Sequence, residues 1–401
     1  MTVRNFRLYF FGQMVSVSGT WMQTVAQGWL IADLTNNSAV YLGLAVALQW
    51  LPMLFFGMYG GLLADRSNKR TILYFTQTAA GLLALVLGIL VSTHHDTLTT
   101  IFVLAFLLGI VNLFDNPARQ SFVQEMVGRN LIANAVSLNS MLMNSGRAIG
   151  PAIAGTLISL AGVAACFYVN AASYITVIVA LALMRTHELE PIRTVRRAKG
   201  QLRLGLRYIG SDPLLRDILV ATAIIGTFAF NFTVTLIQLS KVSFGLRDAL
   251  PYTMLLAAMG IGAIVGGLYI AHRSRPTVGL LAVLASLFGL FLTMVALAPN
   301  VELAVALMVP TGAASIAFLS TANALLQLNS VEHMRGRVMS LYAVAILGST
   351  PIGALTIGLI IKLSNPRIGI LVGSVLTLAT GMWLLLPSHR GRAASDLAVT
   401  A

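Results

Sequence analysis

Charged residues are scarce in this chain. They make up 10% of its 401 residues, whereas an ordinary soluble domain has about a quarter. The chain is 57% hydrophobic, which supplies enough apolar residues for about eleven or twelve spanning helices of about 20 residues each. The composition therefore excludes an ordinary soluble domain and predicts a polytopic membrane protein. Long apolar runs such as 101–111 and 169–184 favour helices over barrel strands.

Several chemical signatures are also missing. Cys166 is the single cysteine, which excludes a disulfide framework and a Cys/His metal site. No Gly-x-x-x-x-Gly-Lys phosphate loop occurs, so ATP is not the expected fuel. The net charge is +13, but the basic residues lie in short loops rather than on one face, so nucleic acid is not an expected partner. The sequence therefore predicts that the protein binds no metal or cofactor and that it is not an enzyme.

Apolar runs between charged residues predict twelve transmembrane helices in two groups of six. The first group covers residues 8–32, 41–64, 71–91, 99–116, 132–160 and 163–184. The second covers residues 217–240, 250–271, 277–298, 301–326, 338–362 and 366–387. We therefore expect an all-α membrane protein with two pseudo-symmetric six-helix bundles, 1–184 and 217–387. A basic cytoplasmic linker, 185–216, joins them, and a cytoplasmic tail, 388–401, follows.

The distribution of lysine and arginine predicts that both termini are cytoplasmic. Twelve spans place both termini on one side of the membrane, and cytoplasmic loops carry an excess of basic residues. In this orientation only Lys241, Arg247, Lys362 and Arg367 fall outside, and Arg147 lies within a span. We expect a multi-pass monomer of the cytoplasmic (inner) membrane, surrounded by the lipid bilayer.

The two halves share a weak internal repeat. Gly60-Gly61-Leu62-Leu63-Ala64-Asp65-Arg66-Ser67 is similar to the segment from Gly266 to Ser274. Asn116 and Gln120 recur as Asn323 and Gln327. The matching pairs are separated by nearly the same number of residues, close to half the chain. This favours duplication of a six-helix unit in parallel orientation, as in transporters whose halves rock about a central site.

Polar residues form stripes on two of the predicted helices. The spacing of three and four places each set on one helix face, and polar faces are costly in lipid. The stripes therefore predict a water-filled substrate cavity, with further polar residues from helices four and ten. Hydrogen bonding between helices without substrate contact is the alternative. The predicted cavity residues are Gln13, Ser16, Thr20, Gln23, Gln27, Asn112, Asp115, Arg147, Thr227, Asn231, Thr235, Gln238, Thr311 and Ser315.

Arg147 lies near the middle of the predicted helix 132–160. A guanidinium at that depth costs several kcal/mol unless it is paired or hydrated. The sequence leaves three candidate partners for the guanidinium: Asp115 on the preceding helix, the polar face of the first helix, or an anionic substrate. A structural pair with Asp115 and a role in substrate binding or coupling both remain possible from the sequence.

Small residues recur at four-residue spacing in four of the predicted helices. They allow the backbones of neighbouring helices to approach closely. Two uses fit this pattern equally well, static packing of helices or a sliding interface between the halves. The pairs are Gly57 and Gly61, Gly146 and Gly150, Gly262 and Gly266, and Ala354 and Gly358.

The loop from Gly61 to Arg70 resembles the signature loop of the major facilitator superfamily. Asn68 replaces its usual second glycine, and we expect a left-handed turn there because asparagine tolerates that conformation. Other stretches resemble the branch of enterobactin exporters and macrolide-type efflux proteins, the transmembrane secretion effectors. They are Asn5-Phe6-Arg7-Leu8-Tyr9, Gly19-Thr20-Trp21-Met22-Gln23, Asp115-Asn116-Pro117-Ala118-Arg119-Gln120, Asn134 to Ser140, Gly150-Pro151 and Arg335-Gly336-Arg337-Val338-Met339-Ser340.

The resemblance implies roles for particular residues. Asp65 is expected to gate the cytoplasmic side, in a loop with Gly61, Arg66, Lys69 and Arg70. The stretch from Arg147 to Pro151 resembles the Gly-Pro element of exporters, with Gly150 and Pro151 as a hinge. Many relatives have an acid in helix one where this chain has Gly28. This departure leaves Asp33, Asp115 and Arg147 as the candidates for proton coupling.

These observations together predict a secondary active transporter. It would export small amphiphilic molecules of drug or siderophore type by alternating access, with protons moving in the opposite direction. The alternative is an uncoupled facilitator or a lipid-translocating protein of the same fold, which the missing acid in helix one favours. A membrane-bound enzyme has no support, because no nucleophile–base pair is evident.

Overall fold

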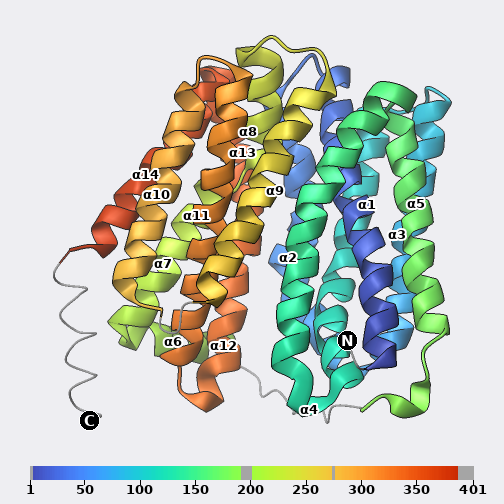
Figure 1. Ribbon diagram of the computed structural model, residues 1–401, viewed down its shortest axis with the longest axis vertical. Helices are drawn as coiled ribbons and strands as arrows, with labels where there is room; N and C mark the ends of the chain where they lie inside the picture. Colours follow the sequence, from blue (N-terminus) through green and yellow to red (C-terminus); the bar gives the residue numbers. More distant parts are fainter. Residues whose placement is uncertain (1–2, 191–200, 273–275, 387–401) are drawn as a thin grey trace. The chain divides into compact units, whose positions relative to one another are not determined.

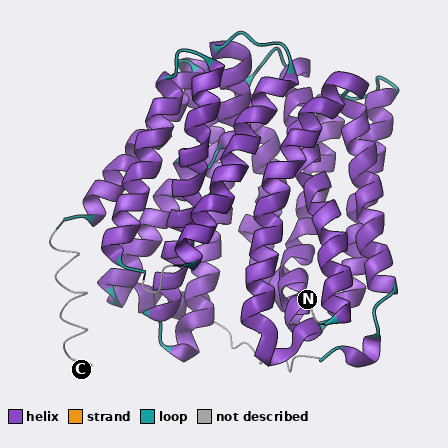
Figure 2. Cartoon of the chain, viewed as in Figure 1, coloured by secondary structure: helices purple, strands orange, loops and turns teal. Residues whose placement is uncertain are grey.

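The computed structural model describes residues 3–190, 201–272 and 276–386, and their side chains except those of 58–66, 129, 130, 133, 201–203 and 333. Within these ranges every regular element is a helix (Figure 2). The prediction of an all-α protein is therefore confirmed. The predicted tail, 388–401, lies outside the described residues, as do Arg273, Arg275 and residues 191–200 of the predicted linker.

The chain divides into two compact units. The first comprises Met1–Arg196 and Arg247–Ala257, and the second comprises Arg197–Leu246 and Ala258–Ala401. Helices of the first unit are α1 (Arg4–Leu34), α2 (Ala39–Arg66), α3 (Lys69–Ser92), α4 (Leu98–Ala161), α5 (Val163–Ala182) and the short η1 (Thr186–Glu188). Helix α9 (Ala249–Ala271) begins in the first unit and ends in the second.

The remaining helices belong to the second unit. They are α6 (Gln201–Ser211), α7 (Pro213–Phe228), α8 (Phe232–Gln238), η2 (Leu239–Ser243), α10 (Val278–Leu297), α11 (Val301–Leu328), α12 (Glu332–Ala343), η3 (Val344–Gly348), α13 (Thr350–Leu363) and α14 (Pro366–Leu384). Of these, η2 and η3 are π-helical. Within the unit, α10 packs against α11 and α14, while α7 packs against α13, α14 and η3 (Figure 1).

In the first unit, α4 lies at the centre of the packing. It contacts α1, α2 and α3, and α5 contacts α1 and α3 (Figure 1). An apolar core near the start of α1 joins four of these helices through Phe6, Tyr9, Leu73, Phe122 and Leu181. This core holds the starts of α1 and α3, the end of α5 and the part of α4 before Gly128 together, beside the polar residues described below.

Ten helical segments among the described residues are long and apolar enough to cross a membrane. Some of them join two helices across an interruption, such as Pro213–Ser243 and Met334–Leu363. Helix α1 is not among the ten, and it carries the predicted polar stripe. The chain is therefore a multi-pass membrane protein, while the predicted count of twelve spans goes beyond these ten.

The predicted loop between the fourth and fifth spans is helical, so the predicted end at residue 116 is wrong. Helix α4 continues through Pro117 and has non-helical dihedral angles only at Gly128, with φ 67° and ψ 177°. The polar sequence around Pro117 suggested a loop. However, Ala118, Phe122 and Met126 lie one turn apart and are buried, so the segment is a helix with one apolar face in the core.

Two predicted continuous helices are interrupted. The predicted helix 217–240 is divided at Ala229–Asn231 between α7 and α8, and it ends in the π-helix η2. Asn231 explains part of this break, because its side-chain Nδ2 donates to the carbonyl oxygen of Thr227 at 2.6 Å. The predicted helix 338–362 contains the π-helix η3, followed by α13 with Pro351 in its first turn.

A helix also occurs where the sequence analysis placed only a linker. Residues 201–211 form α6, which packs against α12. Gly205 lies close to Arg337 and Leu341, and the hydroxyl of Tyr208 accepts a hydrogen bond from the backbone N–H of Val331 at 3.2 Å. Part of the predicted linker thus belongs to the packed structure of the second unit.

Candidate functional site

A buried carboxylate, Asp115, lies at the centre of a polar network in the first unit. Its exposed fraction is 2%. Thr76 Oγ1 and Gln77 Nε2, both on α3, donate to its Oδ1 at 2.8 Å each. Arg119, one turn later on α4, forms an ion pair with its Oδ2. Two neutral donors and one cation thus surround a charge that would otherwise be costly to bury.

Helix α1 adds two polar side chains that complete the surroundings of this network. Tyr9 and Gln13 are each 1% exposed. The hydroxyl of Tyr9 lies within hydrogen-bonding reach of the Gln13 side chain. Gln77 Oε1 and Arg119 Nε are buried atoms without a hydrogen-bond partner among the described residues. Buried polar atoms of this kind are normally satisfied by protein or ordered water. The network therefore retains unused donors and acceptors around the Asp115–Arg119 pair.

A second buried ion pair links α3 to α4. Lys69 Nζ lies 3.2 Å from Glu125 Oε1, and the two side chains are about one-tenth exposed, 9% and 10%. Lys69 was predicted as part of the gating loop, whereas Glu125 had no predicted role. The sequence predicted a cytoplasmic loop at Glu125. The helix that continues past Pro117 places Glu125 in the interior instead. The Lys69–Glu125 pair thus fixes the start of α3 to α4.

Arg70 is also held within the first unit. Its Nε and Nη2 donate to the carbonyl oxygen of Leu181 at 3.0 and 2.7 Å, and its guanidinium lies 5.4 Å from the ring centroid of Tyr74. A cation near the last carbonyls of a helix is stabilised by the helix dipole. Arg70 therefore connects the start of α3 to the end of α5.

The rest of the predicted gating loop is only partly described. The side chains of Asp65 and Arg66 are not among those described, and neither are the contacts of Gly61. Asn68 does not adopt the predicted left-handed turn, because its φ and ψ are −66° and 112°. It is instead the N-cap of α3, and its side chain accepts a hydrogen bond from the backbone N–H of Thr71 at 3.2 Å.

Arg147 lies on α4 beyond Gly128 and faces α1. Its guanidinium is 4.9 Å from the ring centroid of Trp21, and its buried Nε has no hydrogen-bond partner in the part of the chain that the structure describes. Within the described residues it forms no ion pair, since Asp115 pairs with Arg119 instead. The alternative of a structural Asp115–Arg147 pair is therefore not realised.

The predicted hinge residues lie where α4 packs against α1. Gly146 and Gly150 have no room for a side chain: an added Cβ would meet Val17 or Ser18 at Gly146, and Ser18 or Trp21 at Gly150. Helical dihedral angles continue through Gly150 and Pro151. These two glycines thus serve close packing within one unit, and Gly262 and Gly266 pack in the same way against α11 in the other.

The predicted polar stripe of α1 divides between two neighbours. Gln13 lies next to the Asp115 network, whereas Gln23 Oε1 accepts a hydrogen bond from Asn170 Nδ2 on α5 at 2.5 Å. Thr20 Oγ1 lies 3.3 Å from the hydroxyl of Tyr174, also on α5. Part of the stripe therefore bonds between helices, as the alternative interpretation expected. Ser16 and Gln27 are buried as well.

In the second unit the predicted cavity residues bond mostly to their own helices. Thr235 Oγ1 donates to the Asn231 carbonyl oxygen at 3.0 Å, and Thr311 Oγ1 to that of Leu307 at 2.7 Å. Ser315 Oγ donates to the carbonyl oxygen of Gly312 at 2.9 Å. Gln238 is 1% exposed, and Thr227 is half-buried. Asn112, a predicted cavity residue of the first unit, is also half-buried. Asp33, a predicted coupling residue, is exposed at the end of α1.

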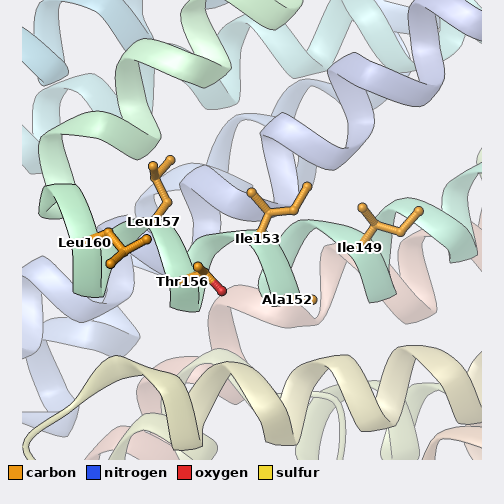
Figure 3. Close-up of a pocket in the computed structure, with 6 residues that line it drawn as sticks. All are labelled: Ile149, Ala152, Ile153, Thr156, Leu157 and Leu160. Carbon is orange, nitrogen blue, oxygen red and sulfur yellow. The ribbon is translucent and has the colours of Figure 1, made fainter.

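Two shallow pockets occur on the helix surfaces, and neither contains a predicted cavity residue. The first follows one side of α4 and is lined by Ile149, Ala152, Ile153, Thr156, Leu157 and Leu160 (Figure 3). The second is lined by Val265, Leu268, Tyr269 and His272 on α9. These predominantly apolar surfaces are suited to lipid tails rather than to polar chemistry. Within the described residues no group of three potential metal ligands occurs.

The fold and these features define a class of protein. Ion pairs and polar networks buried between membrane-spanning helices are typical of multi-pass transporters. The family model of the transmembrane secretion effectors matches residues 1–399, and the chain belongs to this family of the major facilitator superfamily. Membership confirms the predicted superfamily and branch, and it makes the chain a transporter rather than an enzyme.

Curated relatives are similar over different parts of the chain. The enterobactin exporter EntS of Shigella flexneri is 27% identical over 95% of this chain and 91% of its own length. The multidrug efflux pump Tap of Mycolicibacterium fortuitum is 24% identical over 88% and 87%. The staphyloferrin A transporter of Staphylococcus aureus is 25% identical over 63% of this chain. The match spans slightly less than two thirds, 64%, of that relative's length.

Solved structures show the same fold. The crystal structure of an auto-inhibited POT family peptide transporter has a TM-score of 0.76 at 12% sequence identity, covering 96% of this chain and 97% of its own. A bacterial homologue of the human lysosomal transporter Spinster, in an inward-facing and occupied conformation, has a TM-score of 0.73 at 14% identity. It covers 96% of both chains.

Proposed function

We propose that this protein exports small amphiphilic molecules of drug or siderophore type by alternating access, with protons moving in the opposite direction. The relatives that match most of the chain support export, since they are a siderophore exporter and a multidrug efflux pump. The internal repeat supports two six-helix bundles that rock about a central site, with twelve spans in all. In this arrangement α1 and the part of α4 after Gly128 also cross the membrane.

The observation that carries the coupling proposal is the buried Asp115–Arg119 pair with its unused donors. A carboxylate buried inside a spanning helix is rarely retained without a function, because it costs free energy to bury. Proton binding to Asp115 would weaken its attraction to Arg119 and free the guanidinium for other contacts. This change would alter the packing of α1, α3 and α4, and thereby bias one conformation over the other.

The gate, orientation and assembly state complete the proposal. We propose that Asp65, with Arg66, Lys69 and Arg70, stabilises the form closed to the cytoplasm, and that Gly150 and Pro151 let α4 bend. Both termini would face the cytoplasm, in the inner membrane, and the protein would act as a monomer. The Lys69–Glu125 and Arg70–Leu181 contacts support a firm connection between this loop and the helices of the first unit.

Proteoliposomes containing the purified full chain test this proposal. Two fluorescent amphiphiles serve as probes, the anion 1-anilinonaphthalene-8-sulfonate and its neutral counterpart N-phenyl-1-naphthylamine. An imposed pH difference should accelerate the flux of at least one probe, and Asp115→Asn should remove the acceleration. Glu302→Gln is the matched control, since Glu302 belongs to the second unit and is exposed in the first turn of α11. No flux of either probe would contradict export.

The alternative is a transporter without ion coupling, such as a facilitator or a lipid translocator. It is favoured by Gly28, which occupies the position where many relatives have an acid in the first helix. Flux that is equal with and without the pH difference, and unchanged in Asp115→Asn, would support this alternative and exclude antiport.

A further inference from the structure

Arg147 differs from other arginines that lie over aromatic rings. Arg70, over Tyr74, donates to the carbonyl oxygen of Leu181. Arg367 lies 5.5 Å from the ring centroid of Phe244 and donates to the carbonyl oxygens of Ala296 and Ala298 at 2.8 Å each. Both cations therefore have oxygen acceptors as well as a ring.

Arg147 has the ring but no acceptor among the described residues. Its guanidinium lies 4.9 Å from the Trp21 ring centroid, and its buried Nε has no partner. The nearest candidate acid from the sequence, Asp115, is engaged by Arg119, Thr76 and Gln77. A ring face compensates only part of the cost of desolvating a guanidinium, because it accepts no N–H hydrogen bond of full strength.

The depth of Arg147 in its helix excludes the usual solution for an embedded arginine. Arginines near helix ends extend toward the membrane surface, where water solvates the charge. At 1.5 Å per residue, Arg147 is about 28 Å along the helix from Gly128 and about 21 Å from Ala161. The guanidinium of half-buried Arg147 therefore cannot extend as far as either end of this helix.

We propose that Arg147 binds an anionic group of the exported molecule, and that Trp21 packs against its apolar part. This inference rests on the proposed export function and defines the substrate class as amphiphilic organic anions. Planar N–H donors of a guanidinium match the oxygens of a sulfonate, carboxylate or phosphate in a bidentate arrangement. Trp21 lies beside the cation and supplies an apolar face. The missing counter-ion of Arg147 is then carried by the substrate itself.

The two probes introduced above test this inference, because they differ by one sulfonate. Wild-type protein should move the anionic probe faster than the neutral one. Arg147→Gln should lower the rate for the anionic probe by at least about tenfold, the loss expected for one charge-assisted hydrogen bond. The rate for the neutral probe should stay within about twofold of wild type, since the neutral probe has no group for Arg147 to bind. Arg147→Lys should give an intermediate rate for the anionic probe, because it keeps the charge but loses the planar fork.

Arg367→Gln is the matched control, since it makes the same chemical change at another arginine that lies over a ring. It should leave the preference for the anionic probe unchanged. Equal losses for both probes in Arg147→Gln would overturn the inference and make Arg147 a packing residue. Unchanged rates, or a wild-type protein that moves only the neutral probe, would overturn it while leaving export intact. A wild-type protein that moves neither probe would contradict export itself. If the Arg147→Gln protein does not insert into the membrane, the Arg147→Lys variant provides the test. An anionic-to-neutral rate ratio equal to that of wild type in this variant would overturn the inference.

Discussion

The interiors of the two units differ in charge although their sequences repeat. Asn116 and Gln120 of α4 recur as Asn323 and Gln327 of α11. At the same spacing, Asp115 corresponds to Ala322 and Arg119 to Leu326, and all but Arg119 are nearly fully buried. The first unit thus contains an ion pair where the second has two apolar side chains. The second unit shows that this fold packs at these positions without charge, so we expect that folding of the first unit does not require the ion pair.

The largest expected effect comes from making the first unit resemble the second. Asp115→Ala alone leaves Arg119 buried without a counter-ion and should cost about 3–5 kcal/mol of unfolding free energy. Asp115→Ala combined with Arg119→Leu, the residues of the second unit, should recover most of this loss, since a buried pair is often replaceable by apolar residues. Denaturant unfolding in detergent measures both. A double variant as unstable as the single one would show that the pair is needed for folding.

The Lys69–Glu125 pair is the second charged feature of the first unit. Glu125→Gln should lower the unfolding free energy by about 1.5–3 kcal/mol, because it removes the negative charge that contacts the largely buried Lys69 ammonium. The exchange Lys69→Glu with Glu125→Lys should restore part of the stability if the pair acts mainly through charge. Glu332→Gln is the control, because Glu332 occupies the corresponding place in the second unit and is exposed.

Close helix packing should be equally important in the two units. Gly146 packs against Val17 of α1, and the corresponding Gly353 packs against the Thr227 carbonyl of α7. Gly146→Leu and Gly353→Leu should each cost about 1–3 kcal/mol by overpacking. Gly279→Leu should have little effect, because nothing lies within 4 Å of an added Cβ there. If only one of the first two variants is destabilised, the pseudo-symmetry does not extend to this contact.

The smallest effect concerns a cap that both units use. Asn68 caps α3, and Thr277 caps α10 by accepting from the backbone N–H of Leu280 at 3.1 Å. Asn68→Ala and Thr277→Ala should each cost about 1 kcal/mol, and Asn68→Gly only a few tenths. Thermal unfolding measures the differences. A glycine variant that is more stable than wild type would favour the left-handed turn instead.

Sequence reasoning located most helices but failed where polar residues lie inside helices. The segment after Asp115 was interpreted as a loop, so Arg119 and Glu125 were assigned to the cytoplasmic side. In fact Arg119 is a half-buried partner of Asp115, and Glu125 is a buried partner of Lys69. One signal was available: Ala118, Phe122 and Met126 repeat every four residues, as in an amphipathic helix. Pro117 outweighed this signal, although a single proline removes only one backbone hydrogen bond.

Other features depend on contacts that no single segment reveals. The interruption near Asn231 depends on its side chain bonding to the Thr227 carbonyl and on the approach of Gly353 from α13. Arg147 was identified from its depth alone. However, its position over Trp21, and the engagement of Asp115 by Arg119, required the three-dimensional arrangement.

The helical structure of α4 around Pro117 has a practical consequence for experiments that map membrane topology. Such experiments insert an epitope, a protease site or a reporter enzyme into a connecting loop, because exposed loop tips tolerate added residues. Residues 98–161 form two helices that meet at a kink at Gly128, and this kink is their only connection. Insertions near residue 117 would disrupt a packed helix, whereas the turn at Asn36 and Asn37, with its two positive φ angles, is the better place for a tag.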